Sequence, residues 1–280
     1  MRRKLGKRAN CSGKLTERVA LIVEYCGIAF HGWQTQGPLT ATVQQSLERG
    51  LSEVASSEIR VVCAGRTDAG VHATKQVVHF DTPVSRSCRA WVRGTNAHLP
   101  DGVAVQTATP VSNRFHARFS ARWRRYRYLI HNSAIRGGLM QGLITRHHRP
   151  LEEHLMHMAG QALLGEQDFT SVRAAQCQSK TPMRNVMRCA VTRHGDLVVI
   201  DVVANAFLLH MVRNIAGVLM DIGAGVRPVV WMRELLDARD RSIGCKTAAP
   251  DGLYLIDVGY PASSGIEAGP RLPHLLSVAA

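Results

Sequence analysis

The sequence predicts an α+β fold with two similar halves, each an antiparallel sheet with helices on one side, forming a cleft between them. Hydrophobic periodicity gives both halves the rough order strand, helix, two strands, helix, strand. A hairpin signal, His194-Gly195-Asp196, separates two apolar runs and favours antiparallel pairing. A chain of 280 residues is long enough for one large domain or two modest ones. We expect a basic disordered tail at 1–14, an N-terminal α+β domain at 15–113, a C-terminal α+β domain at 114–262 and a loose tail at 263–280.

The first half begins with an apolar run at 18–25 that is typical of a buried strand. A capping-box pattern at 42–45 then opens a helix whose apolar residues recur at helical spacing. The remaining elements of this half are strands at 59–64 and 71–80, a helix at 88–96 and a strand at 103–109.

The second half follows a connector at 115–119. It opens with an alternating strand at 124–130, and a helix is expected at 151–163. Its other elements are strands at 186–194 and 197–204, helices at 207–223 and 229–238, and a last strand at 253–260.

The chain is strongly basic, with 35 Lys and Arg against 21 Asp and Glu and a formal net charge of +14. Several arginines lie next to aromatic residues, in the stretches 114–119 and 122–128. Arginine and aromatic side chains together suit phosphates and unstacked bases, so nucleic acid is the favoured partner. Charge alone leaves open a solvated basic surface or an acidic protein partner.

Other classes of protein fit poorly. No apolar run approaches the length of a membrane span, and the basic N-terminus has no apolar segment behind it, so we expect a cytoplasmic protein without a membrane partner. The seven cysteines are scattered without a C-x-x-C pair, which favours buried, reduced thiols over disulfides or structural zinc. Phosphate-loop, dinucleotide, zinc-protease and nucleophile-elbow motifs do not occur, so we expect no metal and no nucleotide cofactor.

The most informative stretch is 63–73, which reads Cys-Ala-Gly-Arg-Thr-Asp-Ala-Gly-Val-His-Ala. It holds a carboxylate, Asp68, and a guanidinium, Arg66, in a short loop between two predicted strands. A loop aspartate is most often a turn former. Here Gly65 and Gly70 would let another molecule approach the backbone closely, which favours a catalytic role.

Arg213 lies on the predicted helix 207–223, which is apolar nearly all round and should be mostly buried. A buried guanidinium needs a partner, unless it extends to water. We hypothesise that Arg213 pairs with Asp68 and keeps it ionised, which requires the two groups to lie within about 6 Å.

Tyr126 and Tyr128 alternate with Arg125 and Arg127 in one predicted strand, so the tyrosines share one face and the arginines the other. A tyrosine facing a cleft could stack on a base or exchange a proton. Packing in the core explains the pattern equally well.

The stretch 64–73, which contains Arg66 and Asp68, resembles the signature of the tRNA pseudouridine synthase A family. Further motifs of that family follow in order through nearly the whole chain, at 32–34, 42–44, 77–80, 96–100, 115–119, 125–128, 165–171, 210–214 and 252–255. Only the first fifteen or so residues and the last twenty lie outside the resemblance.

The resemblance implies isomerisation of uridine to pseudouridine at positions 38, 39 and 40 of the tRNA anticodon stem-loop. It implies that Asp68 is the catalytic aspartate, that Arg66 helps to flip the target base, that Tyr126 stacks on the uracil and aids proton transfer, and that Arg213 pairs with Asp68. It also implies a homodimer on which each tRNA spans both subunits. The implied tRNA contacts are Arg86, Phe115, His116, Ala117, Arg118, Phe119, Gln176, Cys177, Gln178, Ser179 and Lys180.

Two residues depart from the family pattern. Cys26 stands where an aspartate is usual, and His31 where an aromatic is common; both lie outside the catalytic loop. We expect the basic tail to add nonspecific affinity for RNA. The alternatives are a synthase of this family acting on another RNA, a tRNA-binding module without catalysis and, more remotely, a metal-dependent nuclease.

Overall fold

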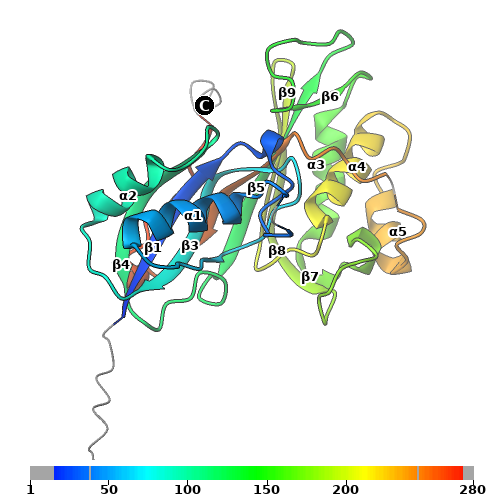
Figure 1. Cartoon of the computed structure of the whole chain (residues 1–280). Helices are drawn as coiled ribbons and strands as arrows, with labels where there is room; N and C mark the ends of the chain where they lie inside the picture. The colour runs from blue at the N-terminus through cyan, green and yellow to red at the C-terminus, as the bar shows by residue number, and fades with distance from the viewer. Residues whose placement is uncertain (1–15, 38, 245, 274–280) are drawn as a thin grey trace, which may run out of the picture.

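The computed structural model describes residues 16–37, 39–244 and 246–273, so the predicted tail at 1–14 lies outside it. The fold is α+β, as predicted, with a mostly antiparallel ten-stranded sheet and helices grouped over its two halves (Figure 1). The strands are β1 (Glu17–Tyr25), β2 (Val62–Cys63), β3 (His72–Thr82), β4 (Val103–Val111), β5 (Trp123–Asn132), β6 (Thr145–His147), β7 (Gly165–Asp168), β8 (Met183–His194), β9 (Leu197–Ala204) and β10 (Leu253–Gly259). The helices are α1 (Val43–Ala55), α2 (Cys88–Asn96), α3 (Glu153–Gly160), α4 (Met211–Gly223) and α5 (Trp231–Ala238).

The strands of the two halves join edge to edge into one sheet, in the order β4-β1-β3-β10-β5-β9-β8-β7. The last strand, β10, lies in the middle. It runs parallel to β3 and antiparallel to β5. The two halves are therefore fixed to each other by backbone hydrogen bonds, and β10 completes the junction between them.

In the first half, α1 and α2 pack against one another, and α2 packs against β4 (Figure 1). The predicted cap forms, since the Thr42 hydroxyl accepts a hydrogen bond from the Gln45 N–H at 3.4 Å. Only Val62–Cys63 of the expected strand at 59–64 forms a strand (β2), because side chains of α1 accept hydrogen bonds from backbone N–H groups of this segment. Ile59 N–H donates to Ser52 Oγ (2.9 Å), and Val61 N–H donates to Glu48 Oε1 (3.0 Å).

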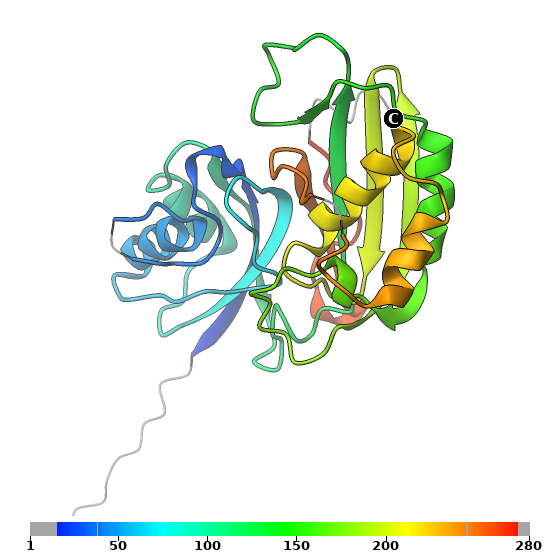
Figure 2. The ribbon, with the colours of Figure 1, turned by 90° about the vertical axis from the view of Figure 1, so that its right-hand side faces the viewer.

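In the second half, β8 and β9 form the predicted hairpin around Gly195, and α3, α4 and α5 gather on one side of the sheet (Figure 2). Helix α4 begins at Met211 rather than at 207, because His210 has a left-handed backbone (φ 60°) that ends the helical conformation. The short strands β6 and β7 have no clear sequence signal.

Residues 263–273 fall in the predicted loose tail, yet they bond to the sheet. Arg271 N–H donates to the Ile256 carbonyl at 3.0 Å. The Lys75 ammonium, fully buried in β3, contacts Asp257 Oδ1 and the Glu267 carbonyl, each at 2.7 Å. Carbonyl oxygens of this segment thus help to satisfy a buried charge.

No helix in the described ranges is long and apolar enough to cross a membrane. Five of the cysteines lie in these ranges, and all five are free thiols. Only Cys63 and Cys189 are buried, so the expectation of buried thiols holds for these two and not for the exposed Cys88.

Candidate active site

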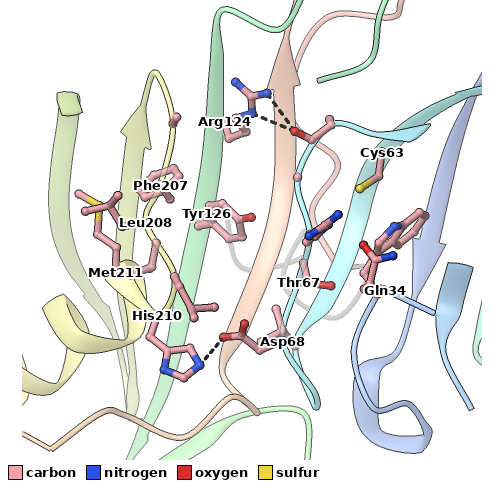
Figure 3. A pocket seen from close by; sticks show the side chains of 18 of the residues that line it. Gln34, Cys63, Thr67, Asp68, Arg124, Tyr126, Phe207, Leu208, His210 and Met211 are labelled. Atoms are coloured by element: carbon pink, nitrogen blue, oxygen red, sulfur yellow. Dashed lines mark hydrogen bonds and ion pairs between the residues drawn. The ribbon is translucent and has the colours of Figure 1, made fainter. Parts of the chain in front are cut away.

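A cavity of about 910 Å³ lies where the two halves meet. Its walls include the loop between β2 and β3, β5 and the segment before α4 (Figure 3). Residues 176–179 and the region of Trp33, Gln34 and Gln44 also line it. All four predicted catalytic residues, Asp68, Arg66, Tyr126 and Arg213, line this one cavity.

Hydrogen bonds from Tyr25, Gln76 and the backbone of Trp33 hold the Asp68 loop in place. The Thr67 hydroxyl bonds with the Tyr25 hydroxyl at 2.8 Å. Gln76 Nε2 donates to the Gly65 carbonyl at 2.6 Å, and the Trp33 N–H donates to the Thr67 carbonyl at 3.0 Å. The loop is therefore anchored on both sides of Arg66, as a preorganised site requires.

Two glycines allow the close packing around this loop. Gly70 has a left-handed φ of +78°, and a Cβ there would lie 2.8 Å from the Pro250 ring. Gly32 (φ +93°) lies against the loop backbone, where a Cβ would meet the Thr67 carbonyl at 2.9 Å. Gly65, in contrast, faces the cavity, since its nearest neighbour would be the Tyr126 hydroxyl at 3.7 Å.

Asp68 and Arg213 form the predicted pair. Arg213 Nη1 donates to Asp68 Oδ2 at 3.1 Å, well inside the 6 Å limit set above, and Asp68 retains 24% side-chain exposure. The guanidinium is itself fixed, because its Nε donates to the Ala248 carbonyl at 2.8 Å. The predicted pairing is confirmed, and the arginine holds the carboxylate in a defined orientation at the cavity wall.

Tyr126 lies in the cavity with its ring edge-on to Phe207, the ring centroids 5.0 Å apart (Figure 3). Burial raises the pKa of its hydroxyl above the usual value, so the group remains a protonated donor at neutral pH. The predicted alternation holds. Tyr128 is buried beside it, while Arg125 and Arg127 both bind Asp201.

The described residues that line the cavity include one carboxylate, Asp68, and five arginines: Arg66, Arg118, Arg124, Arg184 and Arg213. Arg66 is exposed, so its guanidinium is available to another molecule. A concave surface with this excess of positive charge attracts a polyanion.

Arg124 is 8% exposed, and burial lowers its pKa. Its five N–H groups donate only to backbone carbonyls: Ala64 (3.3 and 2.9 Å), Arg118 (2.6 Å), Ala121 (3.3 Å) and Asn205 (2.9 Å). Within the described ranges it has no carboxylate partner. Arg124 therefore ties three walls of the cavity together.

The predicted tRNA contacts divide into two groups. Arg118, Gln176, Cys177, Gln178 and Ser179 line the cavity. The others do not line it, namely Arg86, Phe115, His116, Ala117, Phe119 and Lys180.

The side chains of Phe115 and Ala117 are buried, so the segment 115–119 can offer a ligand chiefly His116, Arg118 and Phe119. Phe119 is 77% exposed, stacks on His116 and lies near the Arg118 guanidinium. An exposed aromatic ring beside an arginine is a suitable stacking platform for a base.

Sequence reasoning gave no role to Arg124 or to His210, whose Nε2 lies 3.4 Å from Asp68 Oδ2. The signal for His210 was its position three residues before Arg213, at the start of the same helix. Arg124 could not be told from its neighbouring arginines, since only the fold shows which of them is buried. In the described ranges no three or more His, Cys, Asp or Glu side chains gather as a metal site would require.

Comparison with known proteins gives a consistent result. The family model for tRNA pseudouridine synthases matches residues 21–120 and 159–261. The tRNA pseudouridine synthase A of Legionella pneumophila (strain Lens) is 56% identical over 249 residues, which cover 89% of this chain and 95% of that protein. Proteins with the same name from Actinobacillus succinogenes and Vibrio campbellii are 54% and 53% identical; the matches cover 92% and 91% of this chain and 98% and 96% of theirs. The chain therefore belongs to the tRNA pseudouridine synthase family and is an isomerase.

Proposed function

We propose that the protein converts uridine to pseudouridine at positions 38, 39 and 40 of the tRNA anticodon stem-loop. The observation that carries this proposal is the Asp68–Arg213 pair, with 3.1 Å between Oδ2 and Nη1, in a basic cavity that also holds Arg66 and Tyr126. A module that only binds RNA needs no fixed, partly exposed carboxylate at the centre of a basic cavity.

The chemistry explains why these residue types are required. The C1′–N1 bond breaks with its electron pair left on the uracil, the base turns, and C5 bonds to C1′. The C5 proton is then removed, and N1 gains a proton. The sum is an isomerisation, in which nothing is oxidised or hydrolysed.

The residues have separate roles in this scheme. Asp68 is the nucleophile or the base of the bond exchange. Arg66 occupies the space of the flipped base, since a nucleotide inside a stem must be extruded before reaction. Tyr126 stacks on the uracil, and its protonated hydroxyl assists proton transfer near C5. Arg213 orients Asp68.

The RNA around the target contacts the cavity mouth and the exposed Arg118–Phe119 platform. The segment 176–180, next to the cavity, contributes further contacts. The family resemblance supports a cytoplasmic homodimer in which each tRNA spans both subunits. Light scattering of the purified protein, alone and with tRNA, tests this assembly.

The decisive experiment maps pseudouridine in an unmodified tRNA transcript after incubation with the wild type or with Asp68→Asn. We expect modification at 38–40 by the wild type and none by the variant, while tRNA affinity is retained. Activity that persists in the variant would remove Asp68 from the mechanism. Modification at other positions would overturn the substrate.

A further inference from the structure

His210 contacts the same carboxylate oxygen as Arg213 does. Its Nε2 lies 3.4 Å from Asp68 Oδ2, and Arg213 Nη1 lies 3.1 Å from that atom (Figure 3 shows the His210 contact). In the described ranges no hydrogen bond reaches Oδ1. Arg213 thus donates to one oxygen of Asp68 and the His210 imidazole approaches the same atom, while within the described ranges the other oxygen has no protein donor.

The backbone of His210 is unusual for its position. Its φ of 60° and ψ of 5° are left-handed, a conformation that is sterically unfavourable for a non-glycine residue. Two further non-glycine residues in the described ranges have positive φ, Ser56 and Arg239, and both stand at helix C-caps, where this conformation is common. His210 stands at a helix N-cap, where an extended backbone is usual.

The imidazole does not act as the helix cap either. No hydrogen bond runs from a backbone N–H of α4 to the His210 side chain. Asn, Asp, Ser or Thr would be the ordinary choice at an N-cap, and histidine offers none of their benefit here. The strained backbone instead directs the imidazole into the cavity toward Asp68, and strain of this kind gathers at functional sites.

We infer that His210 is a positioning residue for Asp68, an inference that rests on the catalytic role proposed above for that aspartate. In the substrate-bound enzyme the His210 Nε2–H donates to Oδ2, and with Arg213 it fixes the carboxylate so that Oδ1 is the reacting oxygen. Hydrogen bonds at catalytic sites are often long before substrate binds and then shorten, which fits the 3.4 Å separation.

The test compares His210→Asn with His210→Gln. Asparagine tolerates the left-handed backbone but is too short to reach Asp68. Glutamine can place its amide nitrogen where the imidazole Nε2 lies. With saturating unmodified tRNA, we expect the single-turnover rate of His210→Asn to fall about 10- to 100-fold, as loss of one hydrogen bond to a charged group predicts. We expect His210→Gln to recover most of the rate, and both variants to bind tRNA as the wild type does.

Several results would overturn the inference: an unchanged rate in His210→Asn, a Gln variant as slow as the Asn variant, or a loss confined to tRNA affinity. Thermal unfolding checks both proteins, and His210→Gly, which also accepts positive φ, replaces the Asn variant if that one does not fold. Asp68→Asn is measured in parallel. If it remains active, the catalytic role proposed for Asp68 and this inference both fail; if it is inactive while His210→Asn is unimpaired, only this inference fails.

Discussion

Replacement of Arg124 by lysine should damage both the stability of the protein and its chemistry. The guanidinium makes five hydrogen bonds, to the carbonyls of Ala64, Arg118, Ala121 and Asn205. An ammonium has three N–H groups, so at least two of the five bonds are lost in any rotamer. At about 1.5–3 kcal/mol for a bond to a charged group, the free energy of unfolding should fall by about 3–6 kcal/mol.

The effect of Arg124→Lys on the reaction rate depends on which carbonyl groups lose their hydrogen bond. Ala64 begins the loop that carries Asp68, and Asn205 begins the segment that leads into α4. A displacement of about 1 Å at a catalytic group can cost about 100-fold in rate. We therefore expect Arg124→Lys to lose about two orders of magnitude in the single-turnover rate under conditions where it remains folded.

Arg125→Lys is the matched control. It removes the same guanidinium from the neighbouring position, but on the opposite face of β5, where Arg125 binds Asp201 at 2.8 Å. Urea unfolding and single-turnover pseudouridine formation are measured for both variants. The control should lose some stability and keep its rate. Equal rates in the two variants, or an Arg124→Lys protein as stable and as fast as the wild type, would refute the reasoning.

Three further predictions concern other parts of the molecule. Lys75→Met leaves Asp257 buried without its cation and should lower the free energy of unfolding by about 3–5 kcal/mol in urea titrations; an unchanged midpoint would contradict the buried pair. The pKa of His79 is lowered to about 4, first by burial and then by nearby positive charge, while its Nδ1 accepts from Ala117 N–H. Below pH 6.5 the folded state therefore binds fewer protons than the unfolded state does. The contribution of His79 to the free energy of unfolding is complete above pH 6.5 and should be lost toward pH 4, at up to about 1.4 kcal/mol per pH unit. His79→Asn should reduce this dependence of stability on pH, and an identical dependence in the variant would contradict the role given to His79. Tyr126→Phe keeps the ring but removes the hydroxyl, so the single-turnover rate should fall about 100-fold at unchanged tRNA affinity, whereas a normal rate would restrict Tyr126 to stacking.

Much of the local structure could be predicted from the sequence because it depends on short-range patterns. The helix expected at 88–96 and the strand expected at 197–204 coincide with α2 and β9. The pairing of Arg213 with Asp68 was also predictable, because a guanidinium on an apolar helix needs a counter-charge and the Asp68 loop offered one.

Where the prediction failed, the outcome depended on contacts or backbone conformations that sequence periodicity does not show. The β-branched run at 59–64 forms only the short β2, since Ser52 and Glu48 of α1 bind backbone groups that a longer strand would have used. Helix α4 begins late because His210 is held in a left-handed conformation, which helical periodicity cannot reveal.

The sequence by itself determined the fold class, most of the helices and strands, the family resemblance and the four residues proposed for the site, because these depend on periodicity, composition and contiguous motifs. Only the tertiary structure decided that β10 closes the sheet between β3 and β5, that Arg124 rather than a neighbouring arginine ties the cavity walls, and that His210 and Arg213 share one oxygen of Asp68. Each of these contacts joins residues far apart in the chain, so it depends on how the assembled backbone brings them together and not on any local pattern.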